Sequence, residues 1–380
     1  QQGVQEEKII RIELDQRRNY RYRDPITLCD YVESIVSNDE ETNYYLFIDE
    51  VQLTQKVIDK ENRNLEVSIY DMLNELKAYK NLDVYVTGSN SKGLSSDIMT
   101  EFRSRATQIH VYPLSFLEYY SYFGGDEQKA LNQYMLYGGM PRIVFIDNEE
   151  EKKEYLSNLY SELYIRDIAE RNHIEREDVL NEILDYLASQ IGSLANSANI
   201  ANALTSLKHE KINSSLVASY IQHTEDAFLI RNAKRYDVKG KNYFKFPSKY
   251  YYTDIGLRNA RLNYRQFDPG HIMENILYNE LIQRGYSVDV GVVVDRTEKQ
   301  NLQREIDFVV NHADKRVYIQ SAFQINTEEK QDSELQSLLL TKDFFKKIVV
   351  RQDISHHFYD ENGILHCNLV DVLLNRVELF

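Results

Sequence analysis

The stretch Tyr44-Tyr45-Leu46-Phe47-Ile48-Asp49-Glu50 decides the fold class of this chain. It is an apolar run followed directly by two acids, which is typical of a buried parallel strand that opens at its carboxyl end. A second apolar run, Val84 to Thr87, leads into the polar turn Gly88-Ser89-Asn90-Ser91. Apolar residues at helical spacing over 27–35 and 67–79 complete an alternation of strands and helices, which predicts an α/β domain with a parallel sheet.

The carboxyl ends of these two strands are expected to meet in one crevice, because parallel strands end at the same edge of a sheet. In a site that hydrolyses phosphate bonds, the first acid, Asp49, would hold Mg²⁺. The second, Glu50, would orient or deprotonate the attacking water. Thr87, Ser89 or Asn90 would position that water or the γ-phosphate.

Two arginines follow the second strand and could neutralise charge that develops on a phosphate, Arg103 and Arg105. A simpler interpretation stays open at this point. Buried strands often end in acids, and clusters of serine and asparagine are ordinary turns.

Composition excludes several classes of protein. The chain has 380 residues, 42% of them hydrophobic, and a formal net charge of −15, so we expect a folded protein and no general nucleic-acid coat. Its apolar runs are far shorter than the roughly 18 residues that a membrane span needs. The two cysteines, Cys29 and Cys367, lack metal-type spacing and suit a reducing compartment, which predicts a cytoplasmic location.

Several motifs in order along the chain resemble one family. They are YLFIDEVQ (45–52), VYVTGSNSKGLSSD (84–97), RATQIHVYPLSFLEYY (105–120), LYGGMP (136–141), YIRDIAERNHI (164–174), RYDVKGK (235–241), KYYYTDIGLRNA (249–260) and MENILYNELIQRGYSVDVG (273–291). Together they resemble the predicted prokaryotic AAA-type (AAA+) P-loop ATPases that carry a C-terminal domain of unknown function.

The resemblance implies ATP and Mg²⁺ as cofactors and Asp49 and Glu50 as Walker B acids. It further implies Thr87 and Ser89 as nucleotide contacts, Asn90 as a γ-phosphate sensor and Arg105 as the candidate arginine. Hydrolysis would drive a conformational change in a complex with a protein partner or with further copies of the chain.

The family's phosphate loop, G-x-x-x-x-G-K-[ST], does not occur in this sequence. The nearest stretch, Gly88 to Gly93, lacks the G-K-[ST] ending. The family's first strand, central between the strand that carries Thr87 and one ending near Pro113, would also be missing. We therefore expect an upstream segment of roughly 30 residues, and we expect the chain as written to bind ATP weakly or not at all.

The sequence predicts four regions. Residues 1–125 form the ATPase core and 126–177 a helical segment. Residues 178–265 read as a winged helix-turn-helix, with three short helices followed by strands over 228–230, 243–246 and 250–253. Residues 266–380 read as an α/β domain.

The winged-helix region is basic. Residues 231–265 hold ten lysines and arginines against two acids, which suits DNA or RNA binding. The candidate contacts are Lys234, Arg235, Lys239, Lys241, Lys245 and Lys249. The preceding helix, 213–227, contains no lysine or arginine and argues against base readout. The alternative is that the basic residues pack inside the protein.

The last region has the order helix, three strands, helix, strand, which resembles the PD-(D/E)xK nuclease fold. By position, the family's metal-binding residues would be Glu274, Asp307 and Gln320. The lysine position of that motif is Ala322, so nuclease activity is not expected. Lys245 or Lys249 could reach in from the wing, and Glu305 shares a strand face with Asp307. A degenerate, structural nuclease fold is the alternative.

Overall fold

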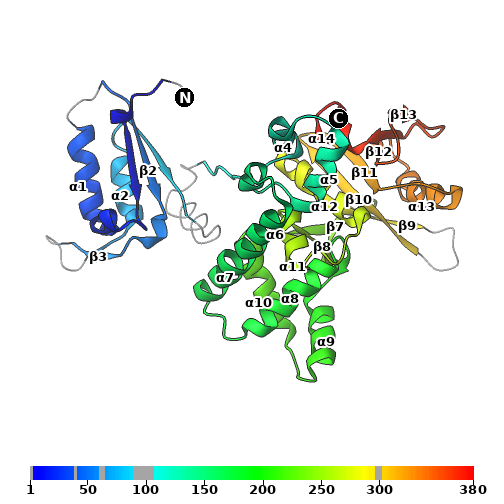
Figure 1. Ribbon diagram of the computed structural model, residues 1–380, viewed down its shortest axis with the longest axis horizontal. Coiled ribbons are helices and arrows are strands. Elements are labelled where there is room, and N and C mark those ends of the chain that lie inside the picture. Colours follow the sequence, from blue (N-terminus) through cyan, green and yellow to red (C-terminus); the bar gives the residue numbers. More distant parts are fainter. Residues whose placement is uncertain (1–2, 38–40, 60–64, 89–106, 296–301) are drawn as a thin grey trace. The chain divides into compact units, whose positions relative to one another are not determined.

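The computed structural model describes residues 3–37, 41–59, 65–88, 107–295 and 302–380, although not the side chains of residues 163 and 244–246. It divides into two compact units, Gln1–His110 and Val111–Phe380 (Figure 1). We call them unit 1 and unit 2 and describe each by itself.

Unit 1 contains the predicted parallel sheet. Its strands lie in the order β1-β2-β5, and both neighbouring pairs are parallel. A short antiparallel pair, β3 and β4, lies apart from this sheet. The elements are β1 (Ile9–Glu13), α1 (Pro25–Val36), β2 (Tyr44–Asp49), β3 (Val57–Ile58), β4 (Glu66–Val67), α2 (Ile69–Leu76) and β5 (Leu82–Val86), with 3₁₀ turns at η1 (Glu6–Lys8), η2 (Arg17–Arg23) and η3 (Val51–Leu53).

One face of this sheet forms the core of unit 1. Side chains alternate along a strand, so Leu46 and Ile48 of β2 are buried together with residues of α1 and α2. Figure 1 shows both helices beside the sheet. Phe47 and Tyr85 point to the opposite face, where their exposed rings stack with their centroids 4.9 Å apart.

The strand expected to end near Pro113 is not formed. Residues 107–112 contain neither helix nor strand, and they span the boundary between the two units. A strand needs a hydrogen-bonded neighbour, and no strand in the described part of the chain pairs with this segment. That prediction was wrong.

Unit 2 begins with helices, and further helices follow between and after its strands. They are α4 (Phe116–Phe123), α5 (Glu127–Tyr137), η4 (Pro141–Phe145), α6 (Glu149–Asn158), the π-helix η5 (Leu159–Ile165), α7 (Arg166–Arg171), α8 (Glu177–Ser189), α9 (Ser197–Lys208), α10 (Ser214–Asp226), α11 (Ile255–Arg261), α12 (Pro269–Gln283), α13 (Glu328–Leu339) and α14 (Leu369–Leu373). Residues 127–175 are largely helical, as predicted.

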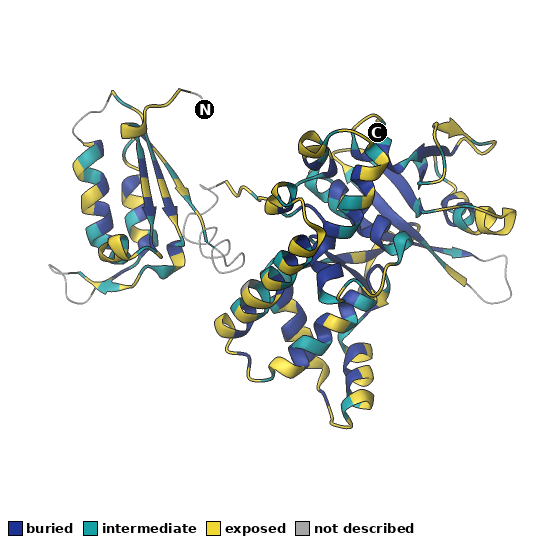
Figure 2. Ribbon diagram, viewed as in Figure 1, coloured by how far each residue is buried: buried dark blue, intermediate teal, exposed yellow. Residues whose placement is uncertain are grey.

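A nine-stranded mixed sheet runs through unit 2 in the order β13-β14-β12-β11-β10-β9-β7-β8-β6. Most of its central strands are dark blue in Figure 2, which marks buried residues. The strands are β6 (Leu194–Ala195), β7 (Ile230–Asp237), β8 (Asn242–Tyr252), β9 (Ser287–Asp295), β10 (Leu302–His312), β11 (Lys315–Ala322), β12 (Lys346–Arg351), β13 (Phe358–Tyr359) and β14 (Leu365–Asn368).

The sheet joins two regions that the sequence analysis separates at residue 265. Strand β7 pairs in parallel with β9, with Arg235 opposite Val290. The hairpin β7–β8 of the predicted winged helix therefore continues the sheet of the predicted nuclease-like region, and both belong to one compact unit.

Local signals set the ends of several helices. Helix α12 starts at Pro269, because the Asp268 side chain accepts hydrogen bonds from the amides of Gly270 and His271. It ends at Gln283, and Gly285 follows shortly after with a φ of +80°. Helix α9 is capped by Asn196, whose side chain accepts a hydrogen bond from the Asn199 amide.

Candidate functional site

The carboxyl ends of β2 and β5 meet, as the sequence predicted. The Thr87 hydroxyl donates a hydrogen bond to Asp49 Oδ1, and the Thr87 amide donates to the Ile48 carbonyl at 2.9 Å. The end of β1 joins them, because the Leu14 amide donates to the Asp49 carbonyl. The exposed Asp49 carboxylate is thus held in place by the neighbouring strand.

Glu50 adopts a left-handed backbone conformation, with φ at +55°. This conformation is uncommon for a residue other than glycine and costs on the order of 1 kcal/mol. The Glu50 amide donates to Asp49 Oδ1 at 3.1 Å, while the Glu50 carboxylate accepts from Gln52. The two carboxylates therefore have different hydrogen-bond partners: Asp49 accepts from Thr87 at the end of β5, and Glu50 accepts from Gln52 in the turn. Ser89, Asn90 and Arg105, the other candidates of this site, lie outside the described residues.

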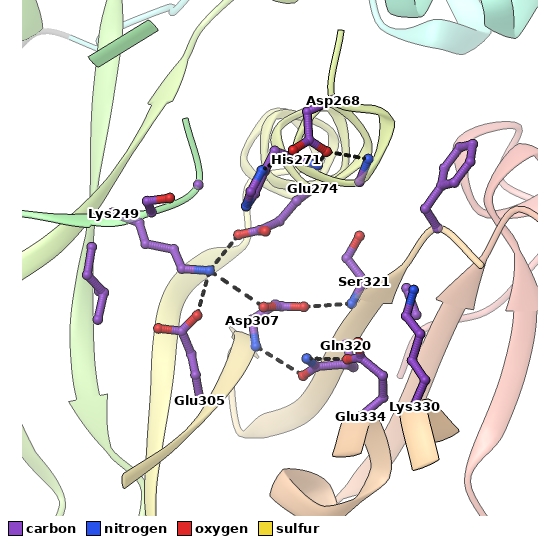
Figure 3. A pocket seen from close by; sticks show the side chains of 16 residues that line it. Lys249, Asp268, His271, Glu274, Glu305, Asp307, Gln320, Ser321, Lys330 and Glu334 are labelled. Atoms are coloured by element: carbon purple, nitrogen blue, oxygen red, sulfur yellow. Dashed lines mark hydrogen bonds and ion pairs between the residues drawn. The ribbon is translucent and has the colours of Figure 1, made fainter. Parts of the chain in front are cut away.

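A second candidate site is an open cavity of about 580 Å³ in unit 2 (Figure 3). It lies where α12, β8, β10, β11 and α13 converge. Its lining includes Gly192, Ser193, Leu194, Lys249, Asp268, Gly270, His271, Glu274, Glu305, Asp307, Gln320, Ser321, Ala322, Phe323, Lys330 and Glu334. All three residues predicted to bind metal in the C-terminal region, Glu274, Asp307 and Gln320, are brought together here.

Lys249 lies at the centre of the charged cluster in this cavity. Its Nζ is 2.7 Å from Glu274 Oε1, 2.6 Å from Glu305 Oε1 and 3.6 Å from Asp307 Oδ1 (Figure 3). Lys249 is only 3% exposed. The shared contact confirms that Glu305 and Asp307, two residues apart on β10, point to the same side of the strand.

Glu274 is fixed by contacts on two sides. The Tyr251 hydroxyl donates a hydrogen bond to Glu274 Oε1 at 2.5 Å. Gly192 lies close by with a φ of +71°, and a Cβ atom there would come within 3.2 Å of Glu274 Oε2. Glycine satisfies both the backbone conformation and the close approach at this position.

Asp307 sits at an irregularity of β10. The register between β9 and β10 shifts between Ile306 and Val309, which marks a bulge. Gly291 of β9 leaves room for it, since a Cβ there would lie 2.9 Å from Ile306 Cβ and 2.8 Å from Val309 Cγ2. Asp307 lies within this irregular stretch and lines the cavity.

Strand β11 and helix α13 contribute residues to the cavity lining, and β11 contacts Asp307 from that side. The Ser321 amide donates to Asp307 Oδ2 at 2.8 Å, and the Asp307 amide donates to Gln320 Oε1 at 3.3 Å. Gln320 Nε2 in turn donates to Glu334 Oε2 at 2.9 Å. This chain of hydrogen bonds fixes the orientation of the Gln320 amide.

Burial and charge shift the pKa values in this cluster in opposite directions. Burial alone would lower the pKa of Lys249, but Glu274, Asp307 and Glu305 together hold that pKa above its usual value. Burial, and then repulsion by Glu274, raises the pKa of Asp307 well above its usual value. Burial also raises the pKa of Glu334. The Lys249 ammonium therefore stays charged at neutral pH.

Lys249 already lies among the carboxylates of the cavity. In the part of the chain that the structure describes, no group of three or more histidine, cysteine, aspartate or glutamate side chains is arranged to hold a metal ion. The oxygen donors of Glu274, Asp307 and Gln320 nevertheless suit a hard cation such as Mg²⁺ in chemistry, and metal binding stays a prediction.

The predicted basic face is only partly a surface. Lys234, Lys239 and Lys241 are exposed. Arg235 is buried, and its Nη2 donates to Gln303 Oε1 at 3.1 Å. Lys249 lies in the cavity, and the Lys245 side chain is not described. Neither Arg235 nor Lys249 is placed to meet a nucleic acid on the outer face of the hairpin.

Sequence reasoning missed four titratable residues of the cavity wall, Asp268, His271, Lys330 and Glu334. His271 precedes Glu274 by three residues, so helical spacing places the two on one face of α12 and was a usable signal. Glu334 and Lys330 share a face of α13 by the same rule. Which surface that helix meets depends on tertiary packing.

Family models match consecutive parts of the chain. An AAA domain matches residues 1–120. Two domains of unknown function match the remainder, DUF8612 over residues 128–268 and DUF4143 over residues 269–369. The change at 268/269 lies close to the predicted boundary at 265/266.

Two curated relatives are uncharacterised proteins. One, from Haemophilus influenzae, is 32% identical over 387 residues, which cover 98% of this chain and 88% of the relative. Another, MJ1544 of Methanocaldococcus jannaschii, is 28% identical over 66% of this chain and 57% of its own length. Among solved structures, the Walker-type ATPase PABY2304 of Pyrococcus abyssi aligns with 66% of this chain and 68% of its own, at 15% identity and a TM-score of 0.41.

No helix in the described ranges is both long enough and apolar enough to cross a membrane.

Proposed function

We propose that this chain, which belongs to a family of AAA-type P-loop ATPase-like proteins with a C-terminal domain of unknown function, is part of an ATPase. That ATPase binds ATP and hydrolyses it in a Mg²⁺-dependent reaction, which needs a phosphate loop of the family's type that this sequence does not contain. Hydrolysis drives a conformational change in a complex with a protein partner or with further copies of the chain. Both cysteines are free thiols, which supports a reducing compartment such as the cytoplasm.

The hydrogen bond from Thr87 to Asp49 is the observation that supports this function best. Carboxylate oxygens are ligands that Mg²⁺ prefers, and the exposed Asp49 carboxylate lies at the sheet edge where nucleotide-binding domains place such a group. Asp49 would hold Mg²⁺, and Thr87 would fix the direction of its carboxylate. Bound Mg²⁺ would supply positive charge beside the phosphates.

Glu50 would orient the attacking water or accept its proton. Through the family resemblance we also assign Ser89 to the nucleotide, Asn90 to the γ-phosphate and Arg105 to the charge that develops on it. These three assignments rest on sequence position.

The test is ATP hydrolysis together with the shift of the melting temperature by Mg-ATP. We expect Glu50→Gln to abolish turnover while the thermal shift persists, and Asp49→Ala to weaken both. Asp83→Asn is the matched control, because Asp83 is an exposed acid at the opposite end of β5. The assay uses this chain and a form extended upstream by a phosphate loop. The proposal fails if neither form hydrolyses ATP, or if Glu50→Gln turns over like the control.

A second function, in unit 2, is favoured by the charged cavity. The order α12, β9, β10, β11, α13, β12 and the convergence of Glu274, Asp307 and Gln320 support a PD-(D/E)xK-like domain that cleaves phosphodiesters. These three residues would hold the divalent cation. The test is cleavage of DNA and RNA with Mg²⁺ or Mn²⁺, which Asp307→Ala should abolish. The control is Asp314→Ala, because Asp314 is an exposed residue in the turn between β10 and β11. This variant should cleave like the wild type.

A nucleic-acid surface on the β7–β8 hairpin is the third proposal. Its support is the exposure of Lys234, Lys239 and Lys241 in an otherwise acidic chain. We expect a salt-dependent mobility shift with DNA or RNA that Lys239→Glu/Lys241→Glu removes. Lys211→Glu, an exposed lysine outside the hairpin, should leave the shift unchanged. An unchanged shift in the double variant would place any binding elsewhere.

A further inference from the structure

The lysine in the cavity of unit 2 comes from a different strand from the one that the sequence motif indicates. Ala322 occupies the motif's lysine position at the end of β11 and is 3% exposed. Lys249 enters from β8, and both residues line the same cavity. The chemical group that the motif lacks is therefore present, delivered from the neighbouring hairpin.

The backbone of Lys249 is held from both sides. Lys249 pairs with Ala233 of β7 and with Leu194 of β6. The short strand β6 follows Gly192 and Ser193, which also line the cavity. A side chain on a strand paired at both edges is positioned more tightly than one on a loop, which is what a reactive site requires.

The cluster differs from a closed structural ion pair. A buried pair that only stabilises a fold usually matches one cation to one anion, because each unpaired buried charge is costly. Here three carboxyl groups surround one ammonium, so the carboxyl groups outnumber the cation. The Glu305 side chain is 30% exposed and opens to the cavity. The site thus has both charge and space left for a ligand.

We propose that Lys249 is the positioning lysine of a phosphodiester-cleaving site in unit 2 and takes the place that Ala322 leaves without an ammonium on β11. This inference rests on the second proposed function. It removes the reason given by the sequence for excluding nuclease activity, since that reason was the alanine at position 322.

The reaction is hydrolysis and needs only water as co-reactant. The water oxygen forms a bond to phosphorus, and the phosphorus–oxygen bond to the leaving nucleoside breaks. The proton of the attacking water passes to Glu305, the more exposed carboxylate of β10, and the leaving oxygen takes a proton from solvent. Lys249 holds Glu305 and Asp307 in place and presents positive charge toward the phosphoryl oxygens. A bound divalent cation would add further positive charge.

Moving the lysine tests the proposal. Lys249→Met removes the ammonium, and Lys249→Met/Ala322→Lys returns one from β11. The matched control is Lys315→Met, because Lys315 is an exposed lysine at the start of β11, at the end away from the cavity residues Gln320 to Ala322. The measurements are kcat and KM for cleavage of a labelled oligonucleotide with Mn²⁺, and the melting temperature of each variant.

We expect Lys249→Met to lower kcat by about 100-fold, with a smaller change in KM, and the double variant to recover at least about tenfold of that loss. Lys315→Met should cleave like the wild type. If Lys249→Met does not fold, cleavage by Lys249→Met/Ala322→Lys tests the proposal instead, because that variant again places one ammonium among the carboxyl groups. A folded double variant without cleavage contradicts the proposal, as does wild-type activity in Lys249→Met. Absence of cleavage by the wild-type protein instead removes the second proposed function, and this inference with it.

Discussion

Asp254 binds the backbone of a segment 115 residues earlier in the chain, because its Oδ2 accepts a hydrogen bond of 2.7 Å from the Gly139 amide. Its Oδ1 accepts another, of 3.0 Å, from the Leu257 amide at the start of α11. Asp254 is 3% exposed. One buried carboxylate thus joins the end of α5 to α11, and the helices at the start of unit 2 to its sheet.

Removing this carboxylate should destabilise unit 2. Asp254→Ala leaves the buried amides of Gly139 and Leu257 without an acceptor, at an expected cost of about 2–4 kcal/mol in the free energy of unfolding. Asp254→Asn keeps one acceptor oxygen and should cost less. Urea denaturation of the three proteins measures the difference. Equal midpoints for wild type and Asp254→Ala would show that the two hydrogen bonds contribute nothing net.

The same residue makes stability depend on pH. Burial raises the pKa of Asp254 to about 6, although the amides of Gly139, Leu257 and Gly256 oppose the shift. In the unfolded chain the pKa is about 3.9. Between these values the folded protein binds more protons at this carboxyl than the unfolded chain does, so stability falls as pH rises.

Asp254→Asn should lack this contribution. Relative to the wild type, its stability should improve by about 3 kcal/mol between pH 4 and pH 7, an order-of-magnitude figure for a shift of about two pH units. Denaturation curves at several pH values give the comparison. Two pH profiles that run parallel through this interval would contradict the assignment to Asp254.

Gly192 should tolerate a side chain less well than Gly285. Both have positive φ, +71° and +80°, so alanine should cost about 1 kcal/mol of backbone energy at either position. At Gly285 nothing lies within 4 Å of the added Cβ, whereas at Gly192 the Cβ meets Glu274 Oε2 at 3.2 Å and His271 Cδ2 at 3.1 Å. We expect a larger loss of stability in Gly192→Ala, measured by thermal unfolding. An equal loss would mean that Glu274 moves aside at no cost.

Thr87→Val should weaken the response of unit 1 to Mg²⁺. Valine keeps the shape of the side chain but cannot donate a hydrogen bond to Asp49, so the carboxylate loses its fixed direction. Loss of a group that orients a metal ligand typically lowers metal affinity by about tenfold or more. The Mg²⁺ concentration for half-maximal ATP hydrolysis should rise accordingly. Thr54→Val is the control, because the Thr54 hydroxyl donates to the Val51 carbonyl nearby.

Both thiols should be unreactive in the folded protein. Burial raises the pKa of Cys29 to about 12, with Glu33 adding to the shift, and burial raises the pKa of Cys367 to about 12 as well. Since the thiolate is the reactive form, a chromogenic disulfide reagent at pH 8 should react with neither cysteine until denaturant is added, and then with both. Rapid labelling of the native protein would show that one of these sites opens locally.

Much of the fold could be predicted because the signals were local. The apolar runs and helical periodicities predicted β2, β5, α1 and α2 to within a few residues, and the parallel direction of the strands in unit 1 followed from the alternation of strands and helices. Strand β8 was less accessible, since the sequence predicted two separate strands over 243–246 and 250–253, on either side of Pro247. The structure keeps one strand and absorbs the proline at a register shift opposite Ala233 and Arg235.

The cavity could be predicted only in part. Glu274, Asp307 and Gln320 followed from the resemblance to the PD-(D/E)xK fold, and the shared face of Glu305 and Asp307 from alternation along one strand. Lys249 was a candidate for a nucleic-acid contact and also for a side chain that reaches in from the wing, and the sequence did not decide between the two. Its burial depends on the pairing of β8 with β6 and β7 and on the position of α12, which are long-range contacts that a local pattern does not contain.

The pairing of β7 with β9 has a consequence for how this protein can be divided. The family models change between residues 268 and 269, but the ammonium of the cavity lies before that point and its carboxylates lie after it. Neither segment carries the whole charged cluster. The two matched regions therefore depend on each other, since either region alone would carry a lysine without its carboxylates, or carboxylates without their lysine.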